Sequence, residues 1–195
     1  MRLLLLLLTA FSFLQAHAQT EEVMLNPVEQ PLSADSARHF HKILIVGEGN
    51  LPARAFIDAI GQELVKAFKE MEIECKYEYL GDKTKTDVKS ALQKAKTWEH
   101  DAIFQLSPLA IVVTKETRIG SASAAEVLLM APLVPARRVK ASYYRNDLDL
   151  SLLENTTTLW FSRLTVESKF GKTAVFKKIR KAIVIDLKRQ NVLAN

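Results

Sequence analysis

Residues 41–80, HKILIVGEGNLPARAFIDAIGQELVKAFKEMEIECKYEYL, decide the fold of this chain. Ile43 to Val46 is a continuous apolar run, as expected of a strand that is buried on both faces. Over residues 50–71 the apolar side chains recur at steps of three and four, which predicts an amphipathic helix. From Ile73 to Leu80 apolar and charged residues alternate, which predicts a half-buried strand. A strand, a crossover helix and a second strand normally form a parallel, right-handed βαβ unit.

The turn between the first strand and the helix contains Gly47, Gly49 and Asn50, and Asn50 is a favourable N-cap. The two glycines are also the start of a dinucleotide-binding fingerprint, but its third glycine is missing, so we interpret them as a tight turn. The backbone N–H groups of Leu51 and Ala53 are suited to hold an anion at the helix N-terminus. Gly47, Gly49 and Asn50 are therefore our candidate anion site.

A second helix and a third strand continue the pattern. Apolar spacing predicts the helix over residues 86–98, with Trp98 on its buried side. The strand begins at Ala102 and continues past Pro108 to Thr114. Because proline cannot donate to a strand ladder, this stretch is either one bent strand or two strands with Pro108 at an edge or bulge.

The chain closes with a hairpin and a helix. Residues 147–167 alternate around a polar turn, which predicts a hairpin with Trp160 buried. Residues 173–191 form an amphipathic helix in which Asp186 is the only acid. The outer face of that helix is basic, with Lys177, Lys178, Arg180, Lys181, Lys188 and Arg189. This face is either an ordinary solvated surface or an attractor of anionic headgroups or an acidic partner.

Together these elements predict an α/β sandwich: a βαβαβ core with a mixed sheet, an additional hairpin and a C-terminal helix. Of the 195 residues, 48% are hydrophobic and 25% are charged, as in an ordinary globular chain. We expect a single α/β domain over residues 41–195. The net charge is +5, but 22 acidic residues are interleaved with the basic ones, so we expect no nucleic-acid partner.

The N-terminus has the pattern of a secretory signal peptide over residues 1–18. A basic start precedes an apolar stretch that is too short to span a bilayer, and Ala16-His17-Ala18 fits a cleavage site. We expect cleavage near Ala18, a leader over residues 19–40, and a periplasmic or secreted protein. Cys75 is the only cysteine, so no internal disulfide can form. We interpret it as a buried, inert thiol, the alternative being an intermolecular bridge.

Residues that would carry catalysis or bind a metal do not form a recognisable set. The patterns G-x-S-x-G, H-E-x-x-H and the P-loop are absent from the sequence. His39 and His41 stand two apart and form either a weak metal-binding pair or an ordinary surface pair, with no cysteine or carboxylate at ligand spacing. We expect no catalytic residue, no metal and no cofactor.

Residues 119–136 are apolar and contain two prolines, although they lie between predicted strands. Such a connection is normally short and polar. The segment either packs on the domain or docks a protein partner or a membrane surface. The candidate interaction surface consists of Val127, Leu128, Leu129, Met130, Leu133, Arg137 and Arg138.

Three stretches together resemble a known group of proteins. They are Asp101-Ala-Ile-Phe104 after an amphipathic helix, the hairpin Leu148-x-Leu-x-Leu152 with Leu159-Trp160, and the closing helix from Ile179 to Leu193. In these stretches the chain resembles small periplasmic proteins of the TolB N-terminal-like group, which includes the LpoB penicillin-binding-protein activators and curli-secretion lipoproteins. The resemblance implies envelope scaffolding, activation of a partner or assembly. The lipobox cysteine of many such proteins is absent, so we expect no lipid anchor.

We therefore expect an exported, non-enzymatic accessory or scaffold protein of the cell envelope that acts through protein–protein contacts. The partner would be an unidentified envelope protein, with peripheral membrane contact as a further option. The alternative is a small-molecule or anion-binding protein that uses the turn after the first strand. An enzyme is the third hypothesis, and no nucleophile–base pair or metal set supports it.

Overall fold

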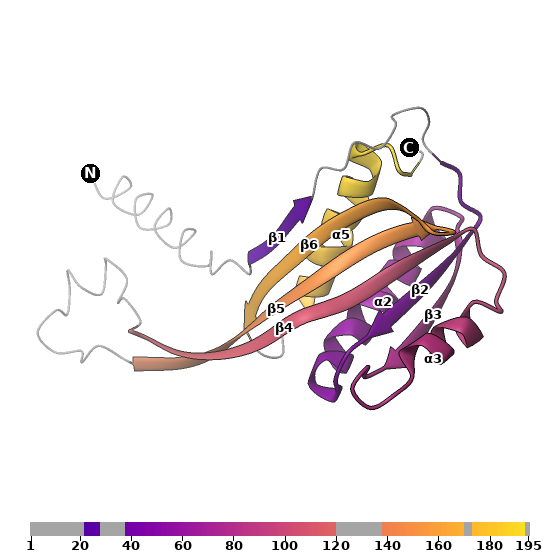
Figure 1. Ribbon diagram of the computed structural model, residues 1–195. Helices are drawn as coiled ribbons and strands as arrows, with labels where there is room; N and C mark the ends of the chain where they lie inside the picture. Colours follow the sequence, from indigo (N-terminus) through magenta and orange to yellow (C-terminus); the bar gives the residue numbers. More distant parts are fainter. Residues whose placement is uncertain (1–21, 28–37, 120–137, 170–172, 194–195) are drawn as a thin grey trace, which may run out of the picture.

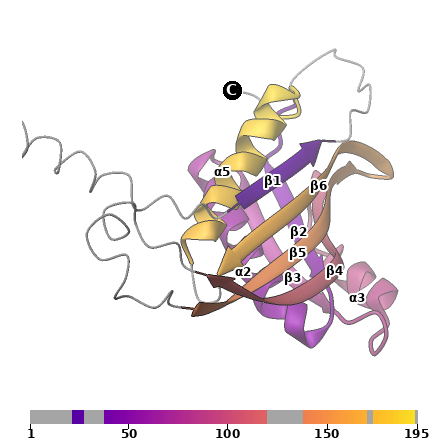
Figure 2. The same ribbon diagram turned by 90° about the vertical axis from the view of Figure 1, so that its left-hand side faces the viewer.

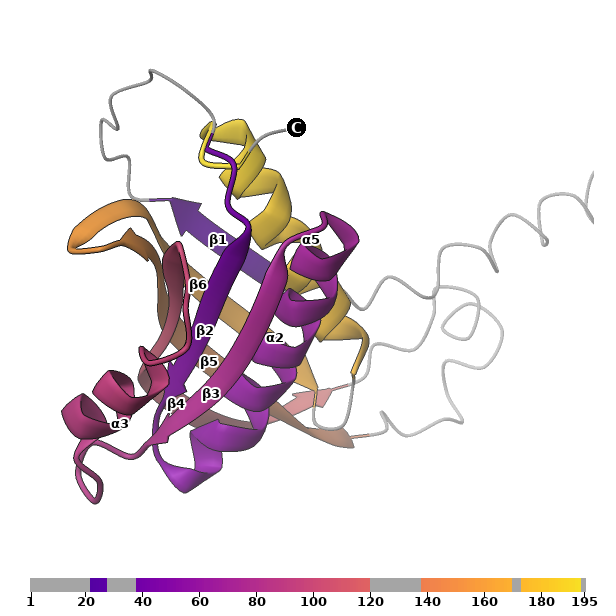
Figure 3. The same cartoon turned by 90° about the vertical axis from the view of Figure 1, so that its right-hand side faces the viewer.

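The computed structural model describes residues 22–27, 38–119, 138–169 and 173–193. Within these ranges the chain forms a six-stranded mixed sheet in the order β1-β6-β5-β4-β2-β3, with three helices (Figure 1). The elements are β1 (Glu22–Pro27), β2 (Lys42–Glu48), α2 (Leu51–Glu70), β3 (Glu74–Gly81), α3 (Val88–Ala95), β4 (Ala102–Ile119), β5 (Arg138–Glu154), β6 (Thr157–Lys169) and α5 (Ala174–Arg189). Helices α2 and α5 cover one face of the sheet and α3 lies on the other (Figure 3). The predicted α/β sandwich is confirmed.

The βαβ unit forms as its pattern predicts. β2 pairs in parallel with β3, where Ile43 lies opposite Cys75 and Ile45 opposite Tyr77. β2 also pairs in parallel with β4, which places it in the interior of the sheet and explains its continuous apolar run. Asn50 caps α2, because its side-chain oxygen accepts the Ala53 N–H at 3.0 Å.

Gly47 lies inside β2 rather than in the tight turn that the sequence suggested. A Cβ atom at this position would stand 2.4 Å from Cγ2 of Ile57 on α2, so the glycine allows strand and helix to approach closely. Ile57 is fully buried in the main core.

Asp101 joins the starts of two strands. One of its carboxylate oxygens accepts the backbone N–H groups of His41 at 2.6 Å and Lys42 at 2.9 Å, and its own N–H donates to the Lys42 carbonyl. Burial raises the pKa of the Asp101 carboxyl, but the N–H groups of Lys42 and His41 outweigh this effect and hold the pKa below its usual value. The aspartate that carries part of the family resemblance therefore fixes the alignment of β2 and β4.

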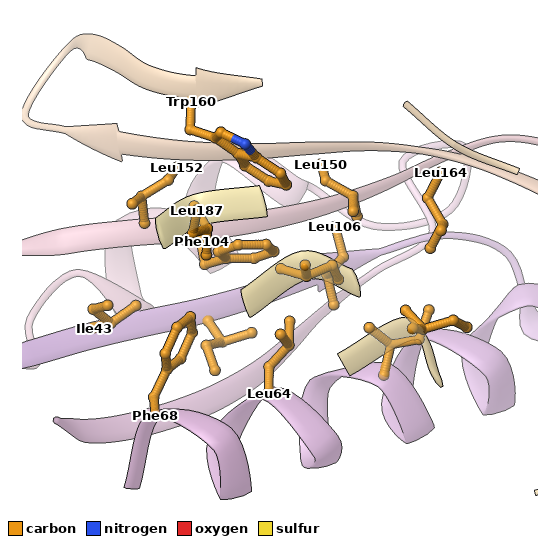
Figure 4. Packing of buried hydrophobic residues seen from close by; sticks show 14 of the residues in the cluster. Ile43, Leu64, Phe68, Phe104, Leu106, Leu150, Leu152, Trp160, Leu164 and Leu187 are labelled. Carbon is orange, nitrogen blue, oxygen red and sulfur yellow. The ribbon is translucent and has the colours of Figure 1, made fainter. Parts of the chain in front are cut away.

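The main core lies between the sheet and the helix pair α2 and α5. Phe104 of β4 packs between Phe68 of α2 and Trp160 of β6, with ring centroids 6.1 and 5.7 Å apart (Figure 4). Trp160 is fully buried, as predicted. Trp98 is half-buried and packs against the smaller apolar cluster under α3, which agrees with its predicted place on the buried side.

Several boundaries differ from the expected ones: β4 continues to Ile119 rather than Thr114, and β5 begins at Arg138 rather than at residue 147. Helix α3 is shorter than the predicted range 86–98, and its N-cap is Asp87, because the Asp87 carboxylate accepts the N–H groups of Lys89 and Ser90. The third strand is a single bent strand, with a register shift between Pro108 and Ala110 in its pairing with β5. Of the two alternatives, the single strand is the one observed, and Pro108 lies at an irregularity within it.

The predicted leader contributes a strand to the sheet. Residues 22–27 form β1, which pairs antiparallel with β6 and lies next to α5 (Figure 2). The sequence predicted no strand here, because these six residues show no alternation of their own. Their strand conformation depends on the ladder that β6 offers.

Candidate functional site

Strands β4 and β5 continue as a ribbon beyond the rest of the sheet (Figure 1). Pairing of β4 with β2 ends at Leu106, and pairing of β5 with β6 ends at Tyr143. The two strands remain paired with each other as far as Ile119 and Arg138. Within the described ranges, residues 115–119 and 138–142 pair only with one another. At about 3.3 Å per residue this two-stranded end is about 15 Å long.

The ribbon leads directly into the predicted interaction surface. Residues 127–137 lie outside the described residues, and so does most of the segment 119–136 from which the surface was inferred. The backbone of Arg138 begins β5 and lies opposite Ile119 at the end of the ladder. The interaction surface therefore stays a prediction, but the structure gives the position from which its segment departs.

A polar network lies at the base of the ribbon, where the parallel strands end. Ser107 donates from Oγ to Oε1 of Glu48 at 3.0 Å, and Gln105 donates to the same serine oxygen at 3.2 Å. Lys83 pairs with the Glu48 carboxylate at 3.6 Å. Glu48 is 9% exposed, so these partners compensate a carboxylate that is largely removed from water. The sequence did not single out this network, since its members are far apart in the chain.

Of the predicted anion site, Gly49 and Asn50 lie between β2 and α2, and Gly47 lies inside β2. The Ala53 N–H, one of the two expected donors, is already bonded to the Asn50 side chain. The neighbouring Glu48 carboxylate adds negative charge to the same turn. The Gly49 carbonyl accepts a hydrogen bond from the Tyr79 hydroxyl. The anion site stays a prediction, with Leu51 as the remaining expected N–H donor.

Ionisable side chains beside this turn are held in structural pairs. The Tyr77 hydroxyl donates to Asp58 at 2.7 Å, and burial together with this bond raises the Tyr77 pKa. The Arg54 guanidinium lies 4.8 Å from the centre of the Tyr79 ring and also pairs with Asp58. These contacts fix the start of α2 against β3.

Cys75 has the character expected from its place in the sequence. It is half-buried against the main core, and burial raises the pKa of its thiol to about 12. The thiol is therefore protonated and unreactive at neutral pH. His39 and His41 are both exposed, and the described residues contain no cluster of three or more potential metal ligands.

No family model matches the chain, and no curated protein matches it. Among solved structures, the PelC dodecamer from Paraburkholderia phytofirmans matches with a TM-score of 0.49 and 9% identity, over 89% of this chain and 100% of that one. A single-residue variant of the PelC dodecamer from the same organism matches at 0.45 and 7%, over 88% and 98%. A minor lipoprotein from Acinetobacter baumannii matches at 0.38 and 8%, over 78% and 97%. At these scores and identities the likeness does not extend to function.

In the part of the chain that the structure describes, no helix combines the length and the apolar character needed to cross a bilayer.

Proposed function

We propose that this chain is an exported, non-enzymatic accessory protein of the cell envelope, and that the segment between β4 and β5 is its contact surface for a protein partner. The observation that supports this proposal is the ribbon itself. Its outer part, residues 115–119 with 138–142, extends past both neighbouring strands. A two-stranded hairpin of this kind is only marginally stable alone, so it adds little to the stability of the body.

The composition of the connecting segment fits a contact surface. Residues 124–134 are mostly apolar, and Arg137, Arg138 and Lys140 follow immediately. Apolar surface beside cationic side chains is typical of protein interfaces, which are rich in methionine and arginine. The described residues that flank this segment, Ile119 and Arg138, lie beyond the ends of the β2–β4 and β5–β6 ladders, and this supports the proposal.

The first experiment locates the contact by photocrosslinking. A photoreactive amino acid replaces Thr117 on the ribbon, and in a control protein it replaces Gln93, which is exposed on α3. We expect adducts with a discrete envelope protein from position 117 and none from position 93. Equal labelling at both positions, or none at 117, contradicts the proposal.

A second experiment removes the ribbon without disturbing the sheet. Thr114 and Tyr143 lie opposite each other in the ladder, so residues 115–142 can be replaced by a two-residue Asn-Gly turn. The shortened protein keeps the pairing of β5 with β6, because that ladder begins at Tyr143. We expect an almost unchanged midpoint of thermal unfolding and loss of the partner found by crosslinking.

A milder variant separates contact from folding. Replacing Leu128, Leu129 and Met130 with Ser keeps the ribbon and removes apolar surface. We expect thermal stability to stay nearly unchanged while the partner association weakens. If this variant unfolds, the three side chains belong to the core, because replacing several buried apolar groups with hydroxyls costs several kcal/mol.

A further inference from the structure

The net positive charge of the chain is concentrated on one helix. α5 carries six basic residues and one acidic residue, a net charge of +5, which equals the net charge of the whole chain. The remaining 21 basic and 21 acidic residues cancel. α5 is therefore a local concentration of positive charge that can attract anions.

The single acid of α5, Asp186, is held inside the protein. Asp186 is only 5% exposed and points inward, where it accepts the Trp160 indole N–H at 2.8 Å. Gln190 and Arg189 contact the same carboxylate. The Asp186 carboxylate therefore bonds to one core side chain, Trp160, and to two residues at the C-terminal end of α5.

Both arginines of α5 form ion pairs within the chain. Arg180 pairs with Glu63 at 3.7 Å and Glu70 at 3.3 Å, both on α2, and Arg189 pairs with Asp186. Arginine is the residue suited to bidentate recognition of a particular carboxylate or phosphate, whereas lysine acts as a mobile point charge. The other cations of α5 are lysines: Lys177, Lys178, Lys181 and Lys188. These four lysines are better suited to bind a diffuse anionic surface than a specific acidic motif.

One large apolar side chain lies among these lysines. Ile185 is 54% exposed, four residues after Lys181 and three before Lys188, so all three lie on one side of the helix. The core already receives Ile183 and Leu187 from the opposite side. On a helix about 24 Å long, the lysines offer electrostatic attraction to anions, and Ile185 offers one apolar contact beside them.

We propose that Lys177, Lys178, Lys181, Ile185 and Lys188 form a docking surface for an anionic lipid bilayer, with α5 lying parallel to the membrane plane. The lysines attract the anionic headgroups, and their methylene stems and Ile185 contact the interfacial region. α5 and α3 lie on opposite faces of the sheet (Figure 3), so α3 stays away from the membrane in this orientation. The proposal is independent of the contact surface between β4 and β5.

The test measures sedimentation of the mature chain with vesicles of equimolar phosphatidylglycerol and phosphatidylcholine, and with phosphatidylcholine alone. We expect binding only to the anionic vesicles at about 20 mM salt, and strong weakening at about 200 mM salt, where charges are screened over a shorter distance. Each lysine near an anionic leaflet strengthens binding by about fivefold, which corresponds to about 1 kcal/mol. No binding of the unmodified chain to anionic vesicles overturns the proposal.

A matched pair of variants separates the surface from the net charge. Lys177→Glu, Lys181→Glu and Lys188→Glu reverse three charges on α5, whereas Lys89→Glu, Lys94→Glu and Lys96→Glu reverse three exposed charges on or beside α3. We expect the α5 variant to lose at least about tenfold in affinity and the α3 variant much less, because only α5 faces the membrane. Equal losses show that net charge alone drives binding and contradict the proposal.

Two further variants and a competitor distinguish lipid binding from instability of the helix and from affinity for an acidic protein. Lys→Gln replacements at the same α5 positions avoid acids near the helix C-terminus, and they should also weaken binding if the variant with glutamates is unstable. Ile185→Ser should reduce vesicle affinity by a few-fold without lowering the unfolding midpoint. The competitors are polyglutamate and added phosphatidylglycerol vesicles. If polyglutamate displaces the vesicle-bound chain as effectively as the added vesicles do, the surface is suited to an acidic protein. The lipid proposal then fails.

Discussion

The two faces of the sheet share the same strands but are covered very differently. On one face, α2 and α5 enclose a large core that includes Phe104, Leu106 and Trp160. On the other face, the short helix α3 covers a small cluster around Leu44 and Val46 near the β2–β3 edge. The alternation of side chains along each strand therefore divides the protein into a face that holds the fold and a face with little apolar packing.

The second face also carries polar contacts away from α3. On β5 and β6, Arg163 pairs with Asp149 at 3.0 Å, and Thr165 donates to Asp147 at 2.7 Å. Cross-strand pairs of this kind satisfy polar groups on a sheet surface but add little stability. We conclude that changes on the helix-pair face affect folding first, whereas changes on the polar face leave the fold intact.

The largest expected loss of stability comes from a comparison of two leucines that lie on opposite faces of the sheet. Leu106 of β4 and Leu44 of β2 are both fully buried, the first under α2 and α5 and the second under α3. Leu106→Ala should reduce the free energy of unfolding by about 4 kcal/mol, because the surrounding core cannot collapse into the cavity. Leu44→Ala should cost about 2–3 kcal/mol, because a two-turn helix can move to fill the space. Equal costs in urea denaturation would show that the two faces are equally rigid.

The second prediction concerns Asp186 of α5, which is 5% exposed. Asp186→Ala leaves the fully buried Trp160 indole N–H without its acceptor, so we expect a loss of about 2–3 kcal/mol. Asp186→Asn keeps an acceptor oxygen and should cost less. Urea denaturation followed by tryptophan fluorescence measures both variants. An alanine variant as stable as the asparagine variant would show that the hydrogen bond is not needed.

Much of this architecture was predictable from the sequence because local patterns specify it. The apolar run of β2, the stripe of α2 and the alternation of β5 each indicate burial without reference to distant residues. Asp186 was different, since the sequence shows only an acid on a basic helix. Its partner is Trp160, on another element, and no local pattern indicates that pairing.

Contacts between distant residues also explain why β1, the Glu48 network and the length of the ribbon were not predicted from the sequence. β1 becomes a strand only through its ladder with β6, so its six residues carry no signal of their own. The Glu48 network joins β2, β4 and the turn after β3, and it exists only once the parallel strands are side by side. The length of the ribbon likewise depends on pairing between β4 and β5 rather than on the composition of either strand.

The third prediction concerns Asp101, which joins the starts of β2 and β4. Asp101→Asn replaces the carboxylate that accepts the His41 and Lys42 N–H groups, and we expect a loss of about 1 kcal/mol at pH 7. Because these bonds hold the Asp101 pKa below its unfolded value, the stabilisation is present above that value and is lost as the pH falls. The difference in unfolding free energy between the unmodified protein and Asp101→Asn should therefore become smaller below about pH 4. Urea denaturation across about pH 3–7 checks this, and a gap that is constant with pH would contradict it.

The smallest effect is expected on the polar face. The Arg163 side chain is 52% exposed, and its pairing with Asp149 raises the pKa of a guanidinium that is already charged at every relevant pH. Solvent screens this ion pair, so Arg163→Ala should leave the urea midpoint almost unchanged. Any loss should shrink further in about 0.5 M salt, because the remaining attraction is electrostatic. The control is Arg163→Lys, which keeps the charge and should be indistinguishable from the unmodified protein. A loss as large as that of Leu44→Ala that does not respond to salt would mean that this face is packed in the folded protein, and the division of the sheet into a structural face and an open face would then be wrong.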